Sequence, residues 1–175
     1  MIRSRFLMVL ASLTLPVAAS AQAPAVIEKE FLLQFEQSMD KFLQLAEAMP
    51  ADRFTWSPGE GVMEVGHVYM HVAHYNYNYP ITSLGMTKPA GLDLDKMESV
   101  RDKAAVIKAL RESRDFVRAA AQKIEGEQWA KTTKLYGRDV PQWSVMLQLV
   151  AHMNEHLGQS IAYARMNKIV PPWSR

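Results

Sequence analysis

The sequence predicts an all-α protein, a four-helix bundle. Four stretches of about 20 to 26 residues carry apolar side chains at the three- and four-residue spacing of amphipathic helices. Turn-rich segments with proline and glycine separate them, and four such helices pack most simply as a bundle. The chain shows no internal repeat, no low-complexity tract and no long linker. We therefore expect one domain with one core.

The first helix is expected at about residues 26–49 and is ended by Pro50. Its stripe consists of large apolar residues and one alanine, namely Phe31, Phe35, Met39, Phe42 and Ala46. The second is expected at about 62–84, after a segment with Pro58, Gly59 and Gly61. Pro80 is expected to kink or end this helix, because proline cannot donate the helical hydrogen bond.

The third helix is expected at about residues 99–124, where Val106, Leu110 and Val117 mark an apolar side. An irregular stretch from 126 to 140 follows, with a short hairpin around Gly137 as the alternative. The fourth helix is expected to begin near Pro141, since proline is tolerated in a first turn, and to reach about Lys168. The proline pair at 171–172 stops it.

Residues 1–21 have the three parts of a secretory signal peptide. Arg3 and Arg5 precede an apolar run from 6 to 17, and Ala19-Ser20-Ala21 forms a small-x-small cleavage site. The run is short for a bilayer span, which takes about 20 apolar residues. We therefore expect residues 22–175 to be the mature domain, periplasmic or secreted, with no stable membrane insertion after cleavage.

The charge of the expected mature domain is balanced. The whole chain has 20 Lys+Arg and 18 Asp+Glu, and the signal segment holds two of the arginines and no acid, which leaves 18 of each. This balance gives no basis for a nucleic-acid partner. The chain has no cysteine. Any metal must therefore be held by histidine, carboxylate or backbone oxygen.

All five histidines fall in two of the expected helices. His152 and His156 are one turn apart, so their imidazoles can converge on one ion. His67, His71 and His74 share a face of the second helix, but the outer two are about 10 Å apart along its axis. One ion cannot easily take all three, and one or two of them can join the pair. The alternatives are hydrogen-bonded core histidines or pH-sensing groups.

Two polar residues accompany the pair on the fourth helix. Residues 152–156 spell H-x-x-E-H, an inverted zinc-peptidase motif in which Glu155 would be the general base. This motif is weakly specific, and Glu155 can equally be a solvated acid. Gln159, one turn beyond His156, can orient a ligand or make an ordinary interhelical hydrogen bond.

Three segments resemble the DinB-like family of small bundle proteins. They are residues 70–77 (MHVAHYNY), 152–159 (HMNEHLGQ) and 167–172 (NKIVPP). The resemblance implies an up-and-down four-helix bundle, often a homodimer, with one divalent metal, zinc or nickel, on three histidines. By motif these are His71, His152 and His156. His67 and His74 depart from the family pattern.

An open three-histidine site is typical of catalytic metals. The DinB-like family includes thiol-dependent transferases and metal-dependent hydrolases. The resemblance therefore implies an enzyme that acts on a small molecule. Glu155, His74 and His67 are the candidate proton carriers. Export favours hydrolysis over thiol transfer, because the thiol cofactors of such transferases are cytosolic. The alternative is a non-catalytic metal- or ligand-binding protein of the cell envelope.

Overall fold

The chain folds as the all-α bundle that the sequence predicts. The computed structural model describes residues 22–174, so the predicted signal peptide at 1–21 lies outside the described part. The four long helices are α1 (Gln22–Ala48), α2 (Val65–Leu84), α4 (Lys103–Lys123) and α5 (Gln142–Met166). A short helix, α3 (Leu94–Met97), lies between α2 and α4. Among residues 22–174, no helix is long and apolar enough to cross a membrane.

The stripe predicted on α1 forms its part of the core. Phe35, Met39 and Phe42 are fully buried. They pack with apolar side chains of the other long helices, among them Val72, Leu110 and Met153. Burial of these side chains is the main force that holds the bundle together. The hydrophobic spacing therefore identified the right faces.

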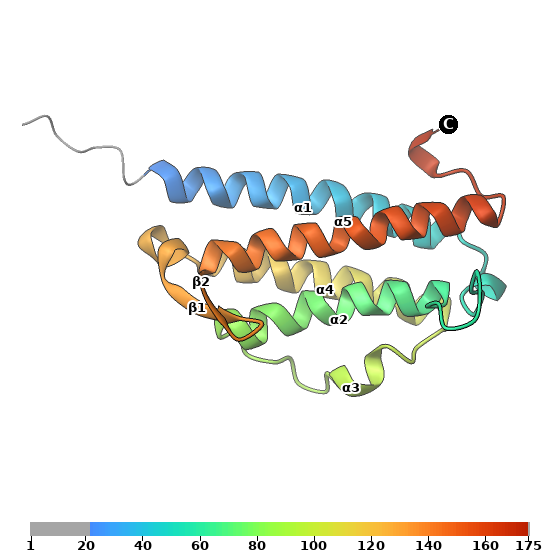
Figure 1. Cartoon of the computed structure of the whole chain (residues 1–175), viewed down its shortest axis with the longest axis horizontal. Helices are drawn as coiled ribbons and strands as arrows, with labels where there is room; N and C mark the ends of the chain where they lie inside the picture. The colour runs from blue at the N-terminus through green and yellow to red at the C-terminus, as the bar shows by residue number, and fades with distance from the viewer. Residues whose placement is uncertain (1–21, 175) are drawn as a thin grey trace, which may run out of the picture.

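In Figure 1, α1 and α5 run from left to right, whereas α2 and α4 run from right to left. The helices therefore follow the order up, down, down, up. α1 packs against α4 and α5, and α2 packs against the same two helices. The start of α2 lies against the residues just before α4. At Gly66, in the first turn of α2, an added Cβ would lie only 2.8 Å from Cδ of Arg101. This order differs from the simple up-and-down bundle that the resemblance implied. Residues 85–102 cross the length of the bundle instead of forming a tight turn.

The crossover from α2 to α4 is pinned at both ends. Gly85 ends α2 with φ 68°, the left-handed conformation that favours glycine. Asp102 caps α4, accepting a hydrogen bond from the backbone N–H of Ala105 at 2.8 Å. Asp93 caps α3 in the same way. The crossover therefore lies along α2 with a defined path, and it carries Glu98.

The stretch between α4 and α5 contains the hairpin that the sequence offered only as an alternative. Strands β1 (Thr132–Leu135) and β2 (Arg138–Pro141) pair antiparallel. Their turn, Tyr136-Gly137, has φ of 51° and 74°, which matches the twist of a two-residue hairpin. In α2, Pro80 does not end the helix. It lies in the last turns, where its missing N–H costs a single helical bond.

Candidate metal centre

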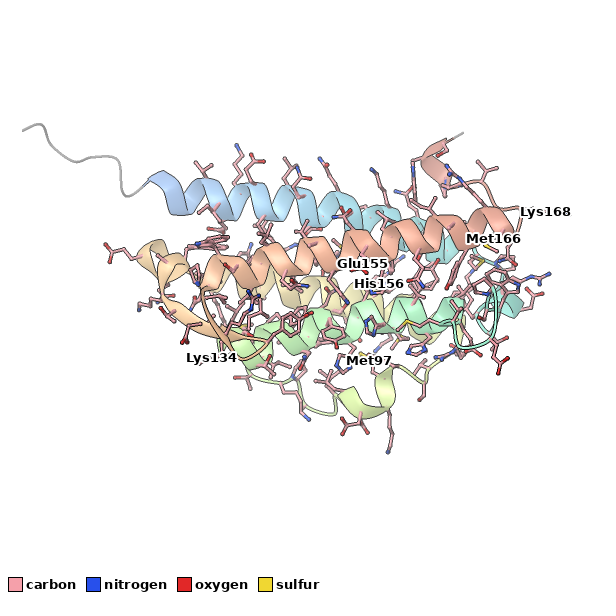
Figure 2. The ribbon with its side chains drawn as sticks, viewed as in Figure 1. Met97, Lys134, Glu155, His156, Met166 and Lys168 are labelled. Carbon is pink, nitrogen blue, oxygen red and sulfur yellow. The ribbon has the colours of Figure 1, made fainter. Side chains whose placement is uncertain are left out.

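The three histidines predicted as ligands converge in the structure. His71 comes from α2, and His152 and His156 come from α5. One donor nitrogen from each lies within 4.8 Å of the other two, a spacing that could hold one metal ion. Figure 2 shows the labelled His156 between the ribbons of α5 and α2. The antiparallel packing of these helices brings together side chains more than 80 positions apart in the sequence.

The α5 half of the centre is oriented by a chain of hydrogen bonds that has one possible direction. The carbonyl of Met63 can only accept, so the Tyr163 hydroxyl donates to it at 3.1 Å. The Tyr163 oxygen then accepts from Nε2 of Gln159 at 2.9 Å. This leaves Oε1 of Gln159 to accept from Nδ1–H of His156 at 2.8 Å. The lone pair of His156 is therefore on Nε2, the nitrogen free to bind a metal.

The α2 half is oriented by Glu98, which the crossover places against the histidine face. Its two carboxylate oxygens lie 3.0 Å from Nδ1 of His71 and 2.9 Å from Nε2 of His67. A carboxylate accepts, so His71 donates from Nδ1 and keeps its Nε2 lone pair. Carboxylate, histidine and metal in this order is a recurrent arrangement in metalloproteins, because the carboxylate fixes the ring and raises its basicity.

The electrostatics disfavour protonation of two candidate ligands, His152 and His71. Burial and the nearby His156 and His71 together lower the pKa of His152 to about 4, against a raising effect of Glu98. Burial also lowers the pKa of His71, against the opposing effect of Glu98. Burial by itself would raise the pKa of Glu98, but hydrogen bonds from His67 and His71 outweigh it, and the net pKa is lowered. At neutral pH these shifts favour unprotonated His71 and His152 beside an ionised Glu98.

His67 and His74 lie on the Glu98 side of the centre. His74 donates from Nδ1 to the backbone oxygen of Leu94 at 3.2 Å and lies 3.7 Å from Glu98. His67, His71 and Glu98 form a second group of donor atoms within 4.8 Å of one another. One carboxylate thus gathers all three histidines of α2, while His71 is the one that also faces α5.

Glu155 lies apart from these groups. It is exposed on α5, and neither group of possible metal donors in the described chain includes it. It precedes His156 in the sequence, and a helix turns about 100° per residue, so it projects from a different side. Its role as a proton carrier stays a prediction.

Glu98 is a site residue that the sequence did not predict. This residue stands in the crossover, 27 and 31 positions from the histidines that it contacts. No local spacing links it to them. The available signal was weak: an acidic residue shortly before the capping Asp102, on a connection long enough to lie back along the histidine helix.

The comparisons with known proteins place the fold and the family. A family model described as the DinB superfamily matches residues 34–163. The chain belongs to the DinB superfamily. This confirms the resemblance seen in the sequence, and the matched region contains all five histidines. No curated protein matches the chain.

Two solved structures are similar to this member of the DinB superfamily. A DinB-like protein from Bacillus cereus ATCC 10987 has a TM-score of 0.72 at 15% identity, covering 82% of this chain and 95% of its own. A DinB-like protein from Bacillus subtilis has a TM-score of 0.50 at 15% identity, with 79% and 92% covered. At this identity the likeness shows the fold.

Proposed function

We propose that this protein is an exported metal-dependent enzyme that acts on a small molecule. One divalent ion, zinc or nickel, would be held by His71, His152 and His156. The observation that carries the proposal is the orientation of the ligands. Glu98 and Gln159 each occupy the Nδ1 of one histidine, so the Nε2 atoms of His71 and His156 are left with free lone pairs. Packing alone gives no reason for two such fixed tautomers around one point.

Three protein ligands leave coordination positions open. When bound, such an ion supplies Lewis acidity, lowering the pKa of a water or thiol or polarising a substrate oxygen. The chain's own residues supply the orientation of the ligands and carriers for the proton. His67 and His74 lie around Glu98, next to His71, and are the candidate proton carriers beside the centre. Glu155, which is exposed and lies outside both donor groups, is a candidate on the sequence motif alone. We favour hydrolysis over thiol transfer because the signal-peptide pattern directs the chain away from cytosolic thiol cofactors.

The alternative is a non-catalytic metal-binding protein of the envelope. The partial burial of the site supports it: the side chain of His71 is 16% exposed and that of His74 is 20% exposed. A bound ion would then be held but reached by few substrates. The two functions differ in whether a small molecule can occupy the open positions.

The test compares zinc- and nickel-loaded protein with chelator-treated protein and with a loaded His156→Ala preparation. The substrates are a panel of small esters, amides and phosphoesters, and a thiol-transfer assay with glutathione runs beside them. The proposal expects turnover that requires the metal and is lost in the variant. If the protein binds metal stoichiometrically but turns over no substrate class, the proposal of an enzyme is wrong. The alternative, a non-catalytic metal-binding protein, is then favoured. Fractionation of cells expressing the full chain tests export.

A further inference from the structure

A row of aromatic side chains leads from the candidate metal centre to the hairpin. The ring of Tyr75 lies 4.7 Å from that of His71 and 4.8 Å from that of His152, centroid to centroid. Tyr79 lies 4.9 Å beyond Tyr75. Tyr136, at the hairpin turn, lies 5.9 Å beyond Tyr79. We call Tyr75, Tyr79 and Tyr136 the tyrosine row.

The hairpin is fixed against α2 by two contacts. The hydroxyl of Thr133 donates to the backbone oxygen of Ser83. The hydroxyl of Tyr136 is hydrogen-bonded to that of Tyr79, which is itself buried. These contacts hold the hairpin turn at the outer end of the row. Figure 1 shows the hairpin beside the end of α2 and the start of α5.

Tyr136 helps to fix the hairpin through its hydroxyl, but its position is unfavourable for folding in two respects. Its backbone has φ 51°, a conformation in which glycine, asparagine or aspartate is favoured and a bulky residue is uncommon. Its side chain is 62% exposed, so it contributes little to the core. A tyrosine held in an unfavourable backbone conformation, with its hydroxyl bonded to a row of rings that ends at the candidate metal ligands, points to a binding role.

We propose that the tyrosine row is the substrate subsite for an aromatic ring carried by the small molecule that the metal centre acts on. This inference rests on the proposed function and names its substrate class. Tyr75 would contact a ring attached next to the reacting group, and Tyr136 would contact the far part of a longer substrate. Tyr79 is 2% exposed and serves to position Tyr136.

The chemistry of the row favours an uncharged aromatic group. Tyrosine rings offer offset and edge-to-face contacts to another ring, each strengthening binding by about 2- to 12-fold. The hydroxyl of the exposed Tyr136 can hydrogen-bond a polar substituent at the outer end of the row. The row contains no carboxylate, ammonium or guanidinium group that would select a charged ligand.

Binding of hydroxamates to the zinc-loaded protein tests the row without relying on turnover. Acetohydroxamate, benzohydroxamate and biphenyl-4-hydroxamate share one metal-chelating group and differ in their rings. We expect benzohydroxamate to bind about 10-fold more tightly than acetohydroxamate. We expect Tyr75→Leu to remove most of that preference. Tyr136→Ala should remove only the additional gain of the biphenyl compound, and Tyr136→Phe should keep most of it.

The same titrations separate the two levels of the proposal. Acetohydroxamate binding in each variant reports whether the metal centre is intact. Trp143→Ala, which alters an aromatic residue facing a different groove beside Ile27 and Phe31, should change none of the three affinities. The tyrosine row is not an aromatic subsite if the aromatic hydroxamates bind no more tightly than acetohydroxamate, or if their tighter binding persists in both Tyr75→Leu and Tyr136→Ala. Either result leaves the proposed metal centre unaffected. Failure of all three compounds to bind zinc-loaded protein overturns the open metal site itself.

Discussion

The two halves of the candidate metal centre are built in different ways. On α5, His152, His156 and the orienting Gln159 belong to one helix, at spacings of one turn. On α2, the orienting group of His71 is Glu98, which comes from the crossover between α2 and α4. One half therefore has its ligands and their orienting group on a single helix, whereas the other is complete only after the chain has crossed the bundle. The first half is expected to tolerate changes in residues 85–102, whereas the second depends on their path.

Glu98→Gln should have the largest effect among the orienting residues. The substitution removes the charge that fixes His71, and loss of such a partner typically weakens metal binding by 10- to 100-fold, so we expect a value of about 50-fold. Competition for zinc against a chelator of known affinity measures the change. Glu155→Gln, the matched change of an exposed acid on α5, should leave affinity for zinc within about 2-fold. Equal losses in both variants would contradict the difference between the halves.

Gln159→Leu should weaken zinc binding less, by about 10-fold, because the amide is a neutral acceptor and its loss lies at the low end of that range. It also breaks the chain that runs from His156 to the carbonyl of Met63. The same chelator competition measures it, with Gln122→Leu on α4 as the control. If Gln159→Leu weakened zinc binding more than Glu98→Gln, the α2 half with its residue from the crossover would not be the more important half for metal binding.

The stability of the metal-free protein should depend on pH through His152. The folded protein lowers the pKa of this residue to about 4, below the value of about 6.5 expected when unfolded. Between these values the unfolded chain binds a proton that the folded chain does not. Stability contributed by His152 is therefore present above pH 6.5 and lost as pH falls toward 4.

After allowance for solvent screening of a partly exposed group, we expect this contribution to be about 1 kcal/mol. Urea unfolding of chelator-treated protein at pH 7 and pH 4.5 measures it. His152→Gln should lose less stability over this interval than the wild type. An equal loss in the two proteins would show that burial does not hold His152 neutral.

The sequence was most informative where the physics is local. The stripe on α1 and the pair His152 and His156 follow from helical periodicity, and each residue is where its spacing put it. Gln159 was also found by spacing, although a hydrogen bond to another helix was equally consistent with the sequence. The choice of His71 among the three histidines of α2 came from the family motif.

The parts that the sequence did not predict depend on distant contacts. Glu98 meets His71 only because the crossover lies along α2, and nothing near either residue encodes that path. The parallel order of α2 and α4 follows from the same crossover. The hairpin was visible as a turn around Gly137, but its docking on α2 through Thr133 and Tyr136 was not. Pro80 was expected to kink or end the second helix, and α2 continues past it to Leu84.

The metal content of the purified protein tests whether His71, His152 and His156 together hold one divalent ion. Elemental analysis would be made on the wild type, on His71→Ala and on His152→Ala, after incubation with zinc or nickel and removal of excess ion. We expect about one equivalent of metal in the wild type and loss of it in both variants, one from each half of the centre. A folded wild-type protein that binds no metal under these conditions would contradict this expectation.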